Sequence, residues 1–169
     1  MDTVRVKRNT NGDSRVADHT PTITEFDSAN SSHRKDVAAL MSSFADEIRS
    51  RGLDHDWTKT EEPYRSIFYR DMCNAIEGTR EFFDGEWHEL HYIKLERHHI
   101  TRACPYNVNL IDVVEMVCDC VAAGMARSGN VDKVIIPAEF LERAVENTVE
   151  LLKDSIILEE DNADDTEIL

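Results

Sequence analysis

The chain has little glycine, proline or cysteine, and it has no long apolar run. Only 6 Gly and 4 Pro occur among 169 residues, whereas apolar residues make up 41%. This composition favours a helical globular protein over an all-β or disordered one, and the length is about that of one domain. No stretch approaches the roughly 20 apolar residues of a membrane span, and the N-terminus lacks the apolar core of a signal peptide. We therefore expect a cytoplasmic protein without a membrane partner.

The 4 cysteines form neither a CxxC pair nor the framework of a small secreted protein. Cys118 and Cys120 are two residues apart in an expected helix, about 200° around its axis, so they cannot hold one ion together. This argues against a closed structural zinc site. We expect four reduced packing residues: Cys73, Cys104, Cys118 and Cys120.

Basic residues are scarce, with 19 Lys and Arg against 34 Asp and Glu, which gives a formal net charge of -15. Affinity for nucleic acid comes mostly from cations that neutralise phosphates, so a duplex-binding surface is not expected. Part of the acidity is local, because residues 154–169 hold seven acidic residues and no basic one. That pattern is typical of a solvated tail.

Patterning divides the chain into three parts. Residues 1–30 are polar without an apolar period and are expected to form a flexible arm, and residues 157–169 an acidic disordered tail. Residues 31–156 are expected to form one compact all-α bundle of about five to six helices. The expected helices begin at Ser31 or Ser32, near Thr58 or Thr60, near Thr79, at Leu110 and at Pro137.

The most apolar of these helices, residues 110–127, is interrupted by acidic side chains. At 100° per residue, Asp112, Glu115 and Asp119 fall within about 60° of one another and form an acidic stripe on a helix that is expected to be buried. Buried carboxylates need metal, His or Arg partners. In the simplest alternative, Asp112 caps the helix and Glu115 meets an Arg, which leaves only Asp119 unexplained.

Histidine weighs against that alternative. Six of the 7 His lie between the first expected helix and the central one, and imidazole together with carboxylate suits Zn, Fe, Mn, Co or Ni. A lone His is more often a core residue than a ligand, but a cluster beside buried acids favours an open metal site. The six are His33, His55, His88, His91, His98 and His99.

The order of these residues resembles a known pattern. His33, then His55-Asp56 22 residues later, then the distant Asp119, resembles the H…HD…D pattern of the HD-domain metal-dependent phosphohydrolase superfamily. Residues 51–68, together with Arg97-His98-His99 and the run from Leu110 to Asp119, are similar to short HD-like phage and bacterial proteins of unassigned function. The resemblance covers roughly residues 33–152 and implies an HD-like helical domain.

The resemblance implies a site. It assigns His33, His55, Asp56 and Asp119 as ligands of a divalent ion (Mn, Fe, Co, Ni, Zn or Mg). His91, His98 and His99 are left open as ligands of a second ion or as residues that orient the first ligands. Lys59 would bind a substrate phosphate. Thr58 stands where relatives more often carry Ser, and its hydroxyl is expected to cap the following helix.

The implied activity is hydrolysis of a small phosphate ester, with a nucleotide as the expected substrate. A metal-activated water would attack phosphorus, while Asp56, Glu115 or a nearby His orients that water or takes its proton.

In the alternative, the chain is a non-catalytic acidic phage-type protein that binds or inhibits a host factor, and its HD residues are structural. It would then act in the host cytoplasm. The last helix could pack on its own core or on a second copy, so a homodimer is left open.

Overall fold

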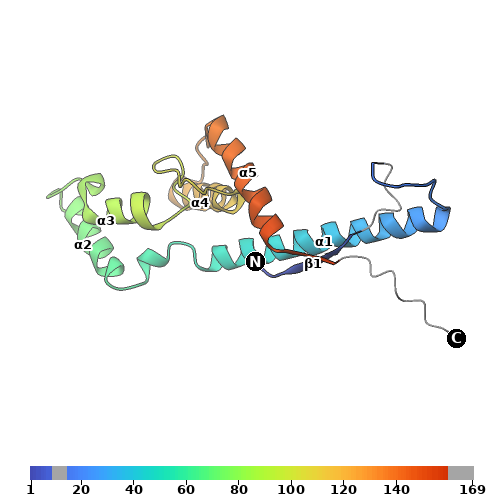
Figure 1. The fold of residues 1–169 in the computed structure, drawn as a ribbon. Helices are drawn as coiled ribbons and strands as arrows, with labels where there is room; N and C mark the ends of the chain where they lie inside the picture. The colour runs from blue at the N-terminus through green and yellow to red at the C-terminus, as the bar shows by residue number, and fades with distance from the viewer. Residues whose placement is uncertain (9–14, 160–169) are drawn as a thin grey trace. The chain divides into compact units, whose positions relative to one another are not determined.

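The computed structural model describes residues 1–8 and 15–159, and within them the protein is mostly helical. Five α-helices and a two-stranded sheet are joined by short 3₁₀ and π segments (Figure 1). The expected all-α class is therefore confirmed. Contacts divide the chain into two compact units, residues 1–47 with 150–169 and residues 48–149. No helix in the described parts has both the length and the apolar character that crossing a membrane requires.

The first unit holds the sheet and most of the longest helix. Strand β1 (Val4–Lys7) pairs in parallel with β2 (Ile156–Glu159), and Val4 lies opposite Ile156. Val4 is buried, and the Ser43 hydroxyl donates to the Asp2 carbonyl at 3.0 Å. Residues 1–30 are thus not simply an arm. The sequence did not reveal β1, because a strand of four residues gives too weak a pattern to be recognised. The expected acidic tail begins within β2, and its residues 160–169 lie outside the described part.

Helix α1 (Ile23–Leu53) begins eight residues before the predicted start at Ser31. Its first turn explains the difference: the Thr22 amide donates to Glu25 Oε2 at 2.7 Å, and the Glu25 amide donates to Thr22 Oγ1 at 3.3 Å. This reciprocal pair is a capping box. At the other end, the helix continues through Gly52 to Leu53.

The second unit contains the candidate site. After α1 come the 3₁₀ segment η1 (Trp57–Lys59) and helix α2 (Tyr64–Ile76). The predicted third helix is instead three short pieces: η2 (Phe82–Asp84), α3 (Glu86–His88) and the π-helical η3 (Glu89–Leu95). π-Helical turns occur frequently at functional sites.

Helices α4 (Leu110–Ser128) and α5 (Ala138–Asp154) are the last two helices of the described chain, and α5 begins one residue after Pro137. Asn109 caps α4 by accepting from the amides of Ile111 and Asp112, and Gly129 ends it with φ 73°. The core of the unit joins α4, α5 and the preceding loop through Ile100, Val108, Val113, Met116 and Ala144.

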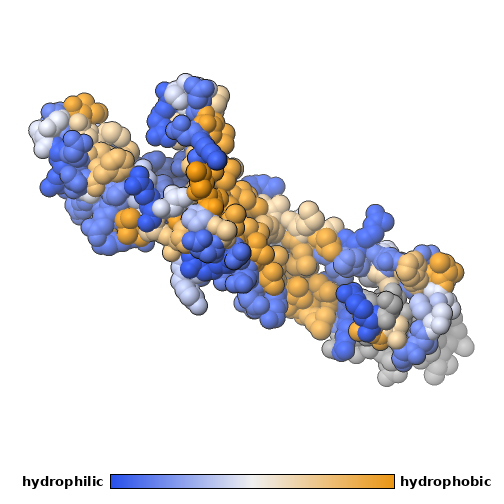
Figure 2. Space-filling view, turned by 90° about the horizontal axis from the view of Figure 1, so that it is seen from above, coloured by the Kyte–Doolittle hydropathy of each residue, from blue (hydrophilic) through white to orange (hydrophobic). Residues whose placement is uncertain are grey.

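Apolar side chains also reach the surface, as the orange atoms in Figure 2 show. On α4 the exposed ones are spaced three or four residues apart: Val114, Val117, Val121 and Met125. On α5 they are Leu141, Val145 and Val149. One face of each helix therefore remains without apolar cover, and the homodimer stays a prediction.

Candidate metal centre

The turn that follows α1 directs two neighbouring side chains into the second unit. Asp56 has φ 56° and ψ 31°, the left-handed conformation that Asp and Asn tolerate best among non-glycine residues. The turn is closed by the Lys59 amide, which donates to the Asp56 carbonyl at 2.8 Å. It places His55 and Asp56 beside histidines from η3 and the loop after it, and beside acids from α4.

One set of side chains, the inner group, surrounds Asp56 Oδ1 and consists of Asp56, His91, His98 and His99. Asp56 Oδ1 lies 3.3 Å from His91 Nε2 and 3.7 Å from His98 Nε2. His99 Nε2 lies 2.8 Å from His91 Nε2. Ligands of one tetrahedral ion, each roughly 2.0–2.1 Å from it, lie about 3.3 Å apart, so these atoms have the spacing of a ligand set.

Two buried atoms support this interpretation of the inner group. Asp56 Oδ1 and His98 Nε2 are buried, and neither makes a hydrogen bond. Buried polar atoms without a partner cost roughly 1–3 kcal/mol each. A cation at the centre of the group would satisfy both atoms together with the ring nitrogens of His91 and His99. The donor set therefore fits a divalent metal.

A second set, the outer group, forms on the other oxygen of the same carboxylate and consists of His55, Asp56 and Asp119. His55 Nε2 lies 3.3 Å from Asp56 Oδ2 and 3.6 Å from Asp119 Oδ1. The side chains of His55 and Asp119 are each 27% exposed, whereas those of His91 and His98 are at most 1% exposed. Asp56, itself 15% exposed, is thus shared between a more buried set and a more exposed one.

Thr58 and Glu96 hold the ring of His91. The buried Thr58 hydroxyl donates to Glu96 Oε1 at 2.9 Å and lies 2.7 Å from His91 Nδ1. Because the one hydroxyl proton is given to the carboxylate, the bond from His91 must be donated by Nδ1, which leaves the lone pair of Nε2 facing Asp56. Trp87 stacks on the same ring with a centroid distance of 4.0 Å. The expected role of Thr58 as a helix cap is therefore replaced by a contact to the centre.

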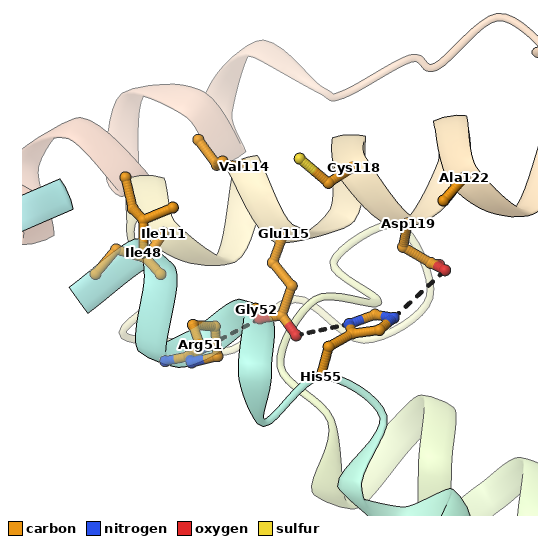
Figure 3. A pocket seen from close by; sticks show the side chains of 10 residues that line it. All are labelled: Ile48, Arg51, Gly52, His55, Ile111, Val114, Glu115, Cys118, Asp119 and Ala122. Carbon is orange, nitrogen blue, oxygen red and sulfur yellow. Dashed lines mark hydrogen bonds and ion pairs between the residues drawn. The ribbon is translucent and has the colours of Figure 1, made fainter. Parts of the chain in front are cut away.

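Glu115 contacts a histidine from each group. Its Oε1 lies 3.0 Å from His55 Nδ1, a contact drawn in Figure 3. The same oxygen lies 3.1 Å from His98 Nδ1, and in both rings the other nitrogen faces Asp56. Burial would raise the pKa of Glu115, but its contacts to His98, His55 and Arg51 lower it to about 2. Carboxylates placed behind metal-binding histidines in this way fix ring orientation and tautomer. Glu115 was one of the groups, with Asp56 and a nearby His, expected to orient the water or take its proton, and a carboxylate with so low a pKa is better suited to orienting than to accepting a proton.

The remaining acid of the stripe is structural. Asp112 is fully buried and accepts from Arg97 Nε at 2.9 Å, from Arg97 Nη2 at 2.7 Å and from Arg51 Nη1 at 2.8 Å. It also accepts from the Asn109 amide in the cap of α4. Arg51 Nη1 reaches Glu115 Oε2 at 3.1 Å as well. The simpler alternative from the sequence therefore describes Asp112 and the Glu115–Arg51 pair, and Asp119 remains for the outer group.

Burial keeps two inner histidines neutral. It lowers the pKa of His91 to about 3, helped by the positive charge of Lys59 and neighbouring histidines, and it lowers that of His99 to about 3 as well. For His98, burial lowers the pKa, but Glu115 and the other carboxylates raise it more. A neutral imidazole is the form that binds metal, so His91 and His99 need not lose a proton first.

Lys59 also reaches the centre. Its ammonium contacts Asp56 Oδ2 and lies 6.0 Å from the ring centroid of Phe68 and 5.9 Å from that of Trp87. Lys59 lines a cavity of about 440 Å³ together with Arg65 and Ser66. The positively charged Lys59 side chain therefore lies beside Asp56, at the turn where the sequence placed it.

The structure does not bring His33 to the centre. It is an exposed residue of α1 in the first unit, and neither group includes it. The sequence hypothesis needed a chain that turns back between His33 and His55, but α1 is helical without a break to Leu53. His88 also lies outside both groups, beside the rings of Phe83 and Tyr92.

Sequence reasoning gave no role to several residues that support the centre. Glu96 and Arg51 act through Thr58 and Glu115, and Trp87 acts through stacking. Nothing in their local pattern distinguishes them from surface charges or core aromatics. The cysteines are free, as expected, but Cys118 is exposed rather than packed.

Comparison with known proteins gives a family but no characterised relative. No curated protein and no solved structure matches the chain. One family model matches residues 22–157, which includes both groups and the whole of α4 and α5. The chain therefore belongs to DUF5662, a family of unknown function.

Proposed function

We propose that this protein is a divalent-metal-dependent phosphohydrolase that acts on a nucleotide or a related small phosphate ester. The observation that carries the proposal is the division of Asp56, whose Oδ1 faces the inner group and whose Oδ2 faces the outer group. Asp56 would then help to hold an ion in each group, and paired ions are typical of enzymes that transfer or hydrolyse phosphate.

The two groups differ in the way that structural and catalytic metal sites differ. The inner group offers four side-chain ligands, of which His91 and His98 are almost completely buried, and this suits a permanently held ion. The outer group offers three side-chain ligands that are partly exposed, which leaves coordination positions for water and substrate. Mn, Fe, Co, Ni, Zn and Mg are the candidate ions.

When bound, the metal supplies a hydroxide nucleophile near neutral pH and polarises a phosphoryl oxygen. In the overall reaction, the water oxygen bonds to phosphorus, the ester P–O bond breaks and the leaving alkoxide takes a proton. Asp56 and Asp119 hold negative charge at the outer group, and Glu115 orients His55 and His98. The Lys59 ammonium offers positive charge for a phosphate oxygen beside Asp56.

The order of residues along the chain also supports the proposal. His55-Asp56, Arg97-His98-His99 and Asp119 stand in the order that resembles the HD-domain phosphohydrolases, and all of these except Arg97 belong to the two groups. Arg97 holds Asp112 at the start of α4. His33, the first residue of the resembled pattern, is replaced in this arrangement by histidines that follow the His-Asp pair.

The test is metal analysis of protein purified without chelator, followed by phosphate release. We expect up to two ions per chain, and phosphate release from nucleoside phosphates or simple phosphate esters with at least one of Mn, Co, Ni, Mg, Fe or Zn. His33→Ala is the matched control, because this exposed histidine lies outside both groups, and it should retain metal content and activity. Absence of metal, or equal metal content in Asp56→Asn, would overturn the site. Tightly bound metal without hydrolysis of any ester would leave a structural centre instead of an enzyme.

A further inference from the structure

A cavity of about 290 Å³ opens beside the outer group, between the last turns of α1 and one face of α4 (Figure 3). His55 and Asp119 form part of its lining, so a molecule in the cavity would touch the outer group directly. Much of the rest is apolar or small: Ile48, Gly52, Ile111, Val114, Cys118 and Ala122. The sequence gave no role to this surface.

The charged groups at the cavity are already paired with one another. Arg51 Nη1 donates to Asp112 and to Glu115, and Glu115 in turn contacts His55. Little polar capacity therefore remains to recognise hydrogen-bonding groups on a ligand, apart from the Cys118 thiol and the ligand atoms of the outer group. Pockets that bind small molecules combine an apolar lining with a few placed polar groups, and here those groups lie at the outer group.

We infer that this cavity binds the apolar part of the substrate, an aryl group whose phosphate lies on the outer group. The inference rests on the proposed function, because it takes the outer group as the place where phosphate binds. The volume agrees with a group of this size, since an apolar cavity of about 150 Å³ is enough to bind benzene. Burial of one aromatic ring should favour an aryl ester over its methyl counterpart by about tenfold or more.

Two positions allow the cavity to be filled without disturbing the ligands. A Cβ atom added at Gly52 meets no heavy atom within 4 Å, and Gly52 is helical. Leucine at this position would therefore narrow the cavity without a backbone clash. Ala122 lies on the opposite wall, on α4, so Ala122→Leu fills the cavity independently. Ala126, an exposed residue of α4 one turn further along, does not line the cavity, so Ala126→Leu makes the same change outside it.

Binding and hydrolysis are measured separately on the full chain with Mn²⁺. Phenylphosphonate and methylphosphonate, which carry no cleavable ester, report binding by calorimetry. Phenyl phosphate and methyl phosphate report hydrolysis. The wild type should bind phenylphosphonate about tenfold or more tightly than methylphosphonate. Gly52→Leu and Ala122→Leu should lose this preference while they retain methylphosphonate binding, and Ala126→Leu should keep it.

These measurements test the apolar subsite separately from the proposed hydrolysis. Equal affinity of the wild type for both phosphonates, or a preference that survives both filling variants, overturns the apolar subsite whether or not esters are hydrolysed. Selective phosphonate binding without release of phosphate from either ester overturns the proposed hydrolysis but leaves the subsite in place. Loss of binding for both phosphonates in Gly52→Leu and in Ala122→Leu also contradicts the inference, because the phosphate position should be unchanged.

Discussion

The inner and outer groups share one carboxylate but are built differently. In the inner group, His91 and His98 are almost completely buried, and the ring of His91 is fixed by Thr58 on one edge and Trp87 on one face. In the outer group, His55 and Asp119 are about one quarter exposed and border a cavity. A centre of this kind can keep one ion while its neighbour exchanges water and substrate. Under the proposed function, tight metal binding would therefore belong to the inner group and reaction with substrate to the outer group.

Asp56→Asn should have the largest effect, because this carboxylate serves both groups. Asparagine also tolerates the left-handed backbone of position 56, so the turn should persist. The substitution removes a negative charge shared by two ions, and we expect metal affinity to fall more than about 100-fold at both groups. Elemental analysis after dialysis measures the metal content, and circular dichroism checks that helix content is unchanged. Retention of one ion at full affinity would show that Asp56 does not bridge.

Asp119→Asn should separate the two groups. The change affects only the outer group, so the chain should keep one tightly bound ion and lose the second. Phosphate release should fall by about 100-fold or more, since the stabilising charge next to the reacting phosphate is lost. Titration of the metal-free protein with metal, monitored by calorimetry, distinguishes the two classes of site. An equal loss of both ions would mean that the groups do not act as separate sites.

Thr58→Val tests the support behind the inner group. Valine keeps the shape of threonine but removes the hydroxyl between Glu96 and His91, so the tautomer of His91 is no longer fixed. Loss of such a supporting contact typically costs 10–100-fold in metal affinity. The inner ion should weaken by about that factor, while Thr58→Ser restores the affinity. A Thr58→Ser variant as weak as Thr58→Val would attribute the effect to packing of the threonine methyl group.

The sequence predicted some of the side chains that come together here, but not all of their geometry. His55, Asp56 and Asp119 come together as expected, because a turn between helices and an acidic stripe on an apolar helix are both local patterns. His33 does not join them, because α1 is unbroken from Ile23 to Leu53 and keeps His33 many helical turns before the turn that holds His55 and Asp56. His98 lies outside the helices, because η3 ends at Leu95 and His98 reaches Asp56 from the following loop.

The residues that support the ligands were the hardest to predict. Glu96 is buried against Thr58, 38 positions earlier, and Arg51 meets Asp112, 61 positions later. Such pairings depend on tertiary packing, so no periodicity along the chain marks them. The helical class was predictable for the opposite reason, because it follows from composition and from apolar spacing within single segments.

Glu115→Gln should have the smallest effect of these substitutions. Its effect on the free energy of unfolding should depend on pH. Glu115 contacts one histidine of each group and also Arg51. Together these contacts lower its pKa from 4.5 to about 2 despite burial. A carboxyl group with a depressed pKa in the folded state adds stability that is complete above the pKa of the unfolded chain and is lost as the pH falls towards the folded value. In metal-free protein, the wild type should therefore exceed Glu115→Gln in unfolding free energy at pH 6, and the gap should narrow as the pH falls from 4.5 towards 2. Urea denaturation at several pH values measures the gap, with the exposed Glu61→Gln as control. A gap that stays constant or widens in acid would mean that Glu115 does not carry its charge between the two groups.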